Sequence, residues 1–202
     1  MKKLHTHYYL WLLLPFLPGC KKEGPRTTHI KGQVTEYGTD DPIAGARIYL
    51  LCDNSVIFGS SGSSLADSLV TDTDGRFDRT YAENELCGSL YLLPYKEGYF
   101  KGTEIDLTTD LKELDVVLDP ETWLKVVTIP DGHIDHLLVS GDFLGAAGYD
   151  VWANQGVKET VFLNRGNRVK NIRWRPWGQI NQTLQDSIYL TGHDTITYTI
   201  HY

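Results

Sequence analysis

The fold class is indicated most clearly by one stretch, Gly32-Gln-Val-Thr-Glu-Tyr-Gly-Thr-Asp-Asp-Pro-Ile-Ala-Gly-Ala-Arg-Ile-Tyr-Leu50. Its Asp40-Asp41-Pro42 step predicts a tight turn, because Asp and Pro favour turn positions. After this turn, polar and apolar side chains alternate through Arg47-Ile-Tyr-Leu50, and a period of two is typical of a half-buried strand. The stretch therefore predicts a strand, a turn and a second strand.

A second stretch, Thr71-Asp-Thr-Asp-Gly-Arg-Phe77, carries the next turn signal. A two-residue primed turn needs positive φ, which Asp74-Gly75 adopts at little cost. We therefore expect a hairpin that pairs residues 68–71 with residues 77–81 around this turn.

Short segments rich in Val, Ile, Thr and Tyr recur along the 202 residues, and no long run shows helical spacing. Acidic side chains outnumber basic ones in the first half of the chain, whereas the second half is nearly balanced. We expect an all-β protein built from two tandem small β-sandwiches. The first spans residues 28–119, and the second, loosely immunoglobulin-like, spans residues 120–202.

The first half resembles the carboxypeptidase regulatory-like domain, a small transthyretin-like β-sandwich. The resemblance covers about residues 28–119 and is carried by Gly32, Pro42-Ile-Ala-Gly-Ala46, Thr71-Asp-Thr-Asp-Gly-Arg-Phe77 and Gly98-Tyr99. It implies a non-catalytic module of the kind appended to exported carboxypeptidases, outer-membrane receptors and surface proteins. The second half resembles no family that we recognise.

The first residues predict export and a lipid anchor. Two lysines precede a short apolar run, and Leu17-Pro18-Gly19-Cys20 then resembles a bacterial lipobox. We expect residues 1–19 to be a lipoprotein signal peptide, Cys20 to carry the lipid, and residues 20–27 to be a tether. The alternative is an ordinary secretory signal with a chance cysteine. The expected location is the bacterial cell envelope, with the outer membrane favoured and the membrane reached through the lipid.

The two remaining cysteines, Cys52 and Cys87, form an even pair in a chain predicted to be exported. Cys52 ends one predicted strand and Cys87 begins another. If those strands are antiparallel neighbours, the two sulfurs fall at the same end of the sheet. We therefore expect a disulfide, with two buried free thiols as the alternative.

The best candidate binding residues lie in the second half, where Arg173-Trp174-Arg175-Pro176-Trp177 ends a basic segment. Trp faces stack on sugar rings, and arginines hydrogen-bond hydroxyls or pair with carboxylates. Strand alternation puts Trp174 on one face of the strand and Arg173, Arg175 and Trp177 on the other. The segment is therefore either a glycan- or protein-binding patch, or a core strand with packed arginine stems.

Other chemistry finds little support in the sequence. His133-x-x-His136 lies among acids, but positions i and i+3 of a strand face opposite sides, so we interpret it as a solvated turn rather than a metal site. The formal net charge of −7 argues against nucleic acid as a partner. No cofactor motif is found. We expect a non-catalytic binding or structural module at the cell envelope, accessory to glycan or peptide uptake, whose partner is a glycan or an envelope protein. The alternatives are a hydrolase with a site between the domains, and a spacer or assembly scaffold.

Overall fold

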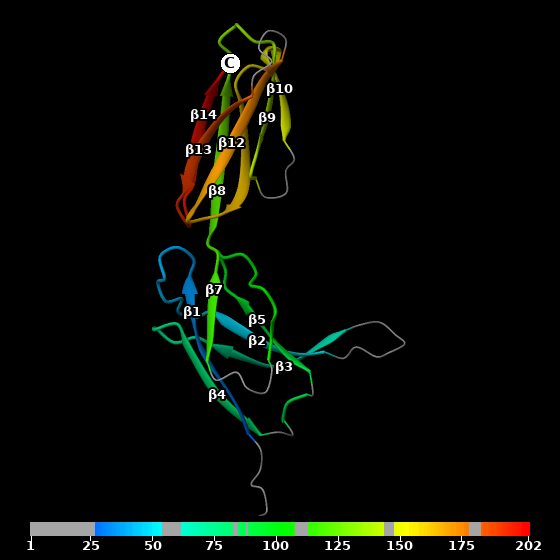
Figure 1. The fold of residues 1–202 in the computed structure, drawn as a ribbon, viewed down its shortest axis with the longest axis vertical. Helices are drawn as coiled ribbons and strands as arrows, with labels where there is room; N and C mark the ends of the chain where they lie inside the picture. The colour runs from blue at the N-terminus through cyan, green and yellow to red at the C-terminus, as the bar shows by residue number, and fades with distance from the viewer. Residues whose placement is uncertain are drawn as a thin grey trace, which may run out of the picture.

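The computed structural model describes residues 27–53, 62–82, 85–87, 89–107, 113–143, 148–177 and 183–202 (Figure 1). The predicted signal peptide and Cys20 lie outside these ranges. Within them, the elements are β-strands apart from the short 3-10 helix Ala153–Gln155 (η2). None of the described helical residues forms a helix long and apolar enough to cross a membrane.

The first sandwich contains a three-stranded sheet in the order β4-β1-β7 and a four-stranded sheet in the order β3-β2-β5-β6. β1 pairs antiparallel with β4 and parallel with β7. The strands are β1 (Thr27–Glu36), β2 (Arg47–Asp53), β3 (Ser63–Val70), β4 (Arg76–Ala82), β5 (Leu90–Tyr95), β6 (Ile105–Asp106) and β7 (Leu114–Leu118).

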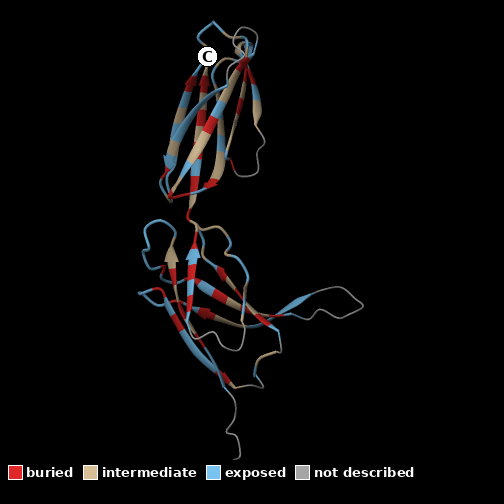
Figure 2. Cartoon of the chain, in the orientation of Figure 1, coloured by how far each residue is buried: buried red, intermediate tan, exposed pale blue. Residues whose placement is uncertain are grey.

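The core of the first sandwich follows from the alternation of apolar residues in its strands (Figure 2). Ile48 and Leu50 of β2 are fully buried, as are Val34 of β1 and Leu92 of β5. Gly32 lets β1 and β7 approach closely, because a Cβ at this position would lie 2.2 Å from the carbonyl oxygen of Leu114. The alternating side chains thus fill the space between the two sheets, and Gly32 allows the close approach of β1 and β7 within one of them.

The hairpin expected around Asp74-Gly75 is wrong. β3 and β4 belong to different sheets, so the turn between them crosses from one layer of the sandwich to the other. Only Gly75 has positive φ there, and the Asp72 carboxylate accepts hydrogen bonds from the amides of Asp74 and Arg76. This side-chain bond stabilises the turn without a primed geometry. The buried Leu69 and Phe77 on either side of the turn enter the same core.

Residues 99–103 do not form a strand. Tyr99 forms only an isolated bridge with Pro120, and the short β6 follows at Ile105. The amide of Phe100 donates to the carbonyl of Asp119 at 2.9 Å. The backbone of this segment therefore hydrogen-bonds to the connection between the two sandwiches. The alternation of side chains along the segment does not predict this long-range contact.

The second sandwich repeats the arrangement of three strands against four. Its sheets have the orders β11-β8-β14 and β10-β9-β12-β13, and β8 pairs parallel with β14. Leu124, Leu137, Ile172 and Leu190 are fully buried between them. The strands are β8 (Glu121–Ile129), β9 (His136–Gly141), β10 (Tyr149–Trp152), β11 (Lys158–Arg165), β12 (Arg168–Trp177), β13 (Leu184–Leu190) and β14 (Thr195–His201).

His136 corrects the interpretation of His133-x-x-His136 as a solvated turn. It is the first residue of β9 and pairs with Trp152 of β10 and Trp177 of β12. The side chain is only 14% exposed. Buried Leu137 and Val139 place β9 inside the four-stranded sheet, and the intervening Leu138 hid the alternation that would have identified the strand.

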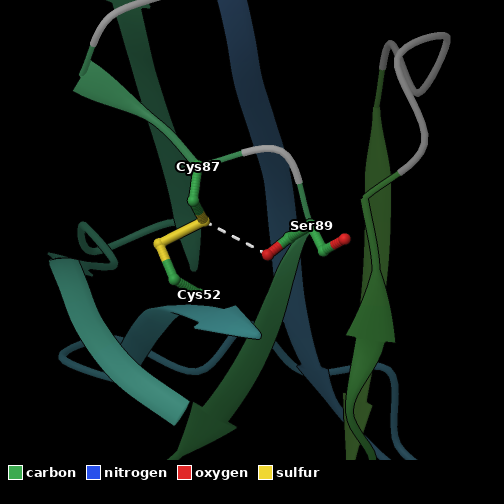
Figure 3. The surroundings of a disulfide bond; sticks show 3 residues. All are labelled: Cys52, Cys87 and Ser89. Carbon is green, nitrogen blue, oxygen red and sulfur yellow. Dashed lines mark hydrogen bonds between the residues drawn. A yellow bond between two sulfur atoms is a disulfide. The ribbon is translucent and has the colours of Figure 1, made fainter. Parts of the chain in front are cut away.

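The disulfide between Cys52 and Cys87 is confirmed (Figure 3). β2 and β5 are antiparallel neighbours, and Cys52 pairs with Leu90 near the start of β5. Cys87 precedes that strand rather than beginning it, and its sulfur lies 3.1 Å from the carbonyl oxygen of Ser89. The link therefore ties the end of β2 to the chain that enters β5.

The two sandwiches lie end to end, and β7 leads into β8 through Asp119 and Pro120 (Figure 1). Both sandwiches bind this connection through the backbone. The amide of Glu121 donates to the carbonyl of Gly98 at 2.8 Å, and the amide of Gly166 donates to that of Pro120 at 2.7 Å. We call the contact region around this connection the joint; its side chains are Glu36, Tyr37, Tyr99, Asp119, Arg165, Asn167, Arg168 and His193.

Glu36 is the centre of the joint. Its carboxylate accepts hydrogen bonds from the Tyr99 hydroxyl at 2.7 Å and from Asn167 Nδ2 at 2.8 Å, and His193 Nε2 lies 3.1 Å from it. Burial alone raises the pKa of Glu36, but the hydrogen bonds from these three residues outweigh it and leave the pKa below its ordinary value. The carboxylate of the first sandwich is thus held ionised by donors from both sandwiches.

A second charge contact lies on the same joint. Asp119 accepts hydrogen bonds from Arg165 at 2.9 Å and from Arg168, whose Nε lies 3.0 Å away. The Arg168 guanidinium also lies 3.9 Å from the centroid of the Tyr37 ring, which belongs to the first sandwich. Two arginines of the sequence's basic segment therefore serve the contact between sandwiches.

Candidate functional site

β12 carries all four residues that the sequence singles out, and the structure separates them. Trp174 faces the second core and lies beside Tyr198, whose ring centroid is 6.1 Å away. Arg173, Arg175 and Trp177 lie on the outer face of the four-stranded sheet. Trp177 is 57% exposed. The outer face, without Trp174, is therefore the surface on which a ligand could bind.

Trp177 is one end of a line of rings that crosses three neighbouring strands. In register with it are His136 of β9 and, beyond that, Trp152 of β10. The His136 and Trp152 rings are stacked, with centroids 4.0 Å apart and an interplanar angle of 2°, and the Trp177 centroid is 5.7 Å from that of His136. We call Trp152, His136 and Trp177 the aromatic strip.

The strip is open to solvent and internally fixed. Trp152 is 47% exposed. His136 Nε2 lies 2.7 Å from a carboxylate oxygen of Asp150, which shares the outer face of β10. This hydrogen bond orients the imidazole between the two indoles, so the strip presents rings whose positions are set before any ligand arrives.

Arg175 and Arg173 extend the site along β12. The Arg175 guanidinium lies 4.8 Å from the Trp177 centroid, within cation–π range. Arg173 Nε donates to Gln185 of β13 at 3.1 Å. His136 covers one face of the Trp152 ring, and Arg175 lies over the Trp177 ring. The site therefore combines two partly exposed indoles with cationic donors on one sheet face, an arrangement suited to ring contacts and hydrogen bonding.

The inner face of β12 beside Trp174 is packed. The Tyr198 hydroxyl donates to Asp186 at 2.7 Å. Burial, followed by this hydrogen bond and the charge of Asp186, raises the pKa of Tyr198 to about 12. Trp174 is thus part of a supporting layer beneath the outer face.

The strip lies at the end of the second sandwich that is far from the joint. β12 begins with Arg168 at the joint and ends with Trp177, a strand of 10 residues that corresponds to about 30 Å. β8 leaves the joint in the same direction, and the label of the last residue lies at that far end (Figure 1). A ligand on the strip is thus held away from the first sandwich.

Sequence reasoning missed Trp152 and His136. Both lie on short strands, and neither strand shows a long alternation that would place its residues on a named face. Their meeting with Trp177 depends on the pairing order β10-β9-β12. The available signal was weaker: a Trp and a His close to predicted turns in an all-β chain.

In the described ranges, no three His, Cys, Asp or Glu side chains converge as metal ligands. The hydrolase alternative expects convergent acids and histidines between the sandwiches. In that region, Glu36 accepts hydrogen bonds from Tyr99 and Asn167, and His193 lies against the same carboxylate. These side chains are therefore already used in contacts of the joint.

Comparison with known proteins gives structural likenesses only. No family model matches the chain, and no curated protein matches it. Among solved structures, the shaft pilin SpaA from Lactobacillus rhamnosus GG is 8% identical, with 87% of this chain and 98% of that chain covered and a TM-score of 0.34. A streptococcal ancillary pilin is 15% identical, with 87% and 62% covered and a TM-score of 0.35. GBS52, the minor pilin of Streptococcus agalactiae, is 15% identical, with 85% and 94% covered and a TM-score of 0.34. Likenesses of this size carry no inference about what the protein does.

Proposed function

We propose that this protein is a non-catalytic, glycan-binding module of the bacterial cell envelope, and that the aromatic strip is its binding surface. The observation that carries the proposal is the line of Trp152, His136 and Trp177 across three strands, exposed at its two indoles. Indole faces provide large, rigid contact areas for the apolar faces of sugar rings.

The dimensions of the strip suit an extended chain of sugars. Strands in a sheet lie about 4.8 Å apart, so the two tryptophans, separated by β9, are carried by strands about 10 Å apart. That separation is roughly the length of a disaccharide. We therefore propose that two neighbouring sugars contact the solvent-exposed parts of the two indoles, one at each end of the strip, with His136 between them.

The rest of the chain, in this proposal, anchors and extends the strip. Lipid on Cys20 would hold the first domain, carboxypeptidase regulatory-like over residues 28–119, to the membrane, with the outer membrane favoured. The second domain, residues 120–202, would then present the strip at its outer end. The lipobox-like Leu17-Pro18-Gly19-Cys20 and the place of the strip opposite the joint support this arrangement.

The binding test uses the full chain on an array of bacterial and plant glycans, followed by calorimetry with each retained glycan. We expect Trp177→Ala and Trp152→Ala to weaken binding by about tenfold or more each, because truncating a tryptophan at the centre of an interface costs about 1–2 kcal/mol or more. Trp123→Ala is the matched control, because Trp123 is 44% exposed on β8 of the opposite sheet. Retention of no glycan, or equal losses for all three variants, would contradict the proposal.

Self-association is a separate outcome of the same variants. If the strip pairs with a second copy of this chain, sedimentation will show a dimer that Trp177→Ala dissociates and that glycan does not affect. That result would replace glycan binding with assembly. A monomer that binds glycan supports the proposal.

The spacer or scaffold alternative has one observation in its favour, namely the joint. Glu36 and Asp119 each receive hydrogen bonds from the second sandwich, so the two sandwiches are coupled by charge-assisted contacts rather than by a free linker. A stiff pair of domains is what a spacer needs, but it also serves a module that must hold its strip away from the membrane.

The anchor is tested separately, by labelling cells with a fatty-acid analogue. We expect label on the protein and its recovery in the membrane fraction, and loss of both in Cys20→Ala. Label that persists in Cys20→Ala would contradict the proposed lipidation site.

A further inference from the structure

Two arginines beside the aromatic strip differ from Arg79, Arg165 and Arg168 in what they contact. Arg165 and Arg168 both bind Asp119, and Arg79 lies 3.0 Å from Asp67. By contrast, no carboxylate of the described residues lies in salt-bridge range of Arg173 or Arg175. Arg173 has a neutral partner, Gln185, and Arg175 lies against the Trp177 ring.

These two cations share one face with the exposed indole. Arg173, Arg175 and Trp177 are at alternate positions of β12, so their side chains project in one row, with about 7 Å between successive members. The guanidinium of Arg175 is already beside the ring on which a sugar would stack. A substituent on that sugar would therefore reach a guanidinium without any change in the sheet.

Two carboxylates flank this face. Asp150 is on β10, where it holds His136, and β9 separates it from Arg175, with Leu138 in register between the two. Asp142 accepts a hydrogen bond from Asn171 of β12 and interacts electrostatically with Arg173. Of the two cations, Arg175 is therefore the one nearer the strip and farther from Asp142, and it favours the orientation that places a ligand's negative charge over β12.

We infer that the strip selects glycans whose sugars carry carboxylates, the uronic acids, with the ring of a uronate on Trp177 and its carboxylate on Arg175 and Arg173. The inference rests on the proposed glycan binding and adds the class of sugar. A guanidinium offers two parallel donors that match the two oxygens of a carboxylate, whereas a neutral sugar hydroxyl uses only one of them. The indole supplies affinity, and the arginine row supplies the preference for charge.

The test compares two probes of one ring geometry, tetragalacturonate and its fully methyl-esterified, uncharged form, by calorimetry with the full chain. We expect the acid to bind about tenfold tighter or more, the scale of a charge-assisted hydrogen bond. Arg175→Gln should remove most of that preference while leaving the affinity for the ester nearly unchanged. Raising the salt concentration should weaken binding of the acid only. Arg76→Gln is the control, because Arg76 is an exposed arginine at the start of β4, in the other sandwich.

The outcomes separate this inference from the proposed function. Equal affinity for acid and ester, with both lost in Trp177→Ala, would overturn the preference for uronates and leave glycan binding intact. A preference for the acid that Arg175→Gln and Arg76→Gln reduce equally would overturn the assignment to the arginine row. Binding of neither probe overturns the inference; the proposed function also fails if the glycan array retains nothing.

Discussion

Asn167 Nδ2 of the second sandwich lies 2.8 Å from Glu36 Oε1 of the first, although 131 positions of sequence separate the two residues. The same Nδ2 lies 2.9 Å from the carbonyl oxygen of Tyr37, and Asn167 Oδ1 accepts from the amide of Gly192 at 2.9 Å. Asn167 also has a left-handed backbone, with φ of 54°. One buried amide thus satisfies groups in both sandwiches from a conformation that Asn tolerates better than most residues.

Replacing this amide should weaken the joint. We expect Asn167→Ala to lower the free energy of unfolding by about 2–3 kcal/mol, because buried partners lose their hydrogen bonds and Ala is less tolerant of positive φ. Urea denaturation measures the loss, and small-angle scattering measures whether the two sandwiches become mobile. Asn154→Ala, on the exposed side of η2, is the control. Equal stability of the two variants would contradict the role given to Asn167.

Acid should loosen the joint through Glu36. The pKa of Glu36 is below its ordinary value of 4.5 in the folded protein. The folded state therefore binds this proton less readily than the unfolded state does, and stability that is fully present above pH 4.5 is lost as the pH falls through the folded pKa. We expect Glu36→Gln to be less stable than the wild type at pH 7 and to lose less stability between pH 5 and about pH 3. Denaturation curves across this range test the expectation, with exposed Glu104→Gln as the control. Parallel pH profiles for wild type and Glu36→Gln would show that Glu36 does not carry the effect.

The disulfide should stabilise the first sandwich. Cys52 and Cys87 are separated by 35 positions, for which the chain-entropy estimate is about 3–4 kcal/mol. We expect the Cys52→Ala/Cys87→Ala variant to unfold at a lower denaturant concentration, with a smaller effect on the second sandwich. Reductant should shift the wild type toward the variant and leave the variant unchanged. A wild-type curve that reductant does not move would contradict the prediction.

The two tryptophans of β12 should differ in what they do for stability. Trp174 packs on the second core, so Trp174→Ala leaves a cavity and should cost about 2–4 kcal/mol. Trp177 is largely exposed, and Trp177→Ala should change stability by less than about 1 kcal/mol. Thermal unfolding of the two variants measures the difference. Similar losses of stability in the two variants would show that Trp177 is packed against the sheet rather than exposed.

Gly32 should tolerate no side chain. The Cβ of Gly32→Ala would meet the carbonyl oxygen of Leu114 at 2.2 Å, and both groups are backbone-fixed in the β1–β7 pair. We expect a loss of about 2–3 kcal/mol, with β7 displaced. Gly62→Ala is the matched control, because a Cβ there meets nothing within 4 Å. Equal melting temperatures would show that the strands move apart at no cost.

Features that depend on residues close together in the chain could be predicted without the structure. An all-β chain follows from recurring strand-length alternation, and the burial of Ile172 between the exposed Arg173 and the outer-facing Asn171 follows from the same period of two. The disulfide was also predictable, because Cys52 and Cys87 are the two cysteines besides Cys20 in a chain predicted to be exported. The lipid anchor at Cys20 remains a prediction.

The identity of neighbouring strands could not be predicted in this way. Alternation assigns a side chain to a face but does not name the strand beside it, because pairing energy depends on contacts between residues far apart in sequence. Hence β3 and β4 entered different sheets despite the turn signal between them. The same long-range pairing brought Trp152 and His136 beside Trp177 and joined Glu36 to Asn167. Both the candidate site and the joint are products of strand order, which no local pattern records.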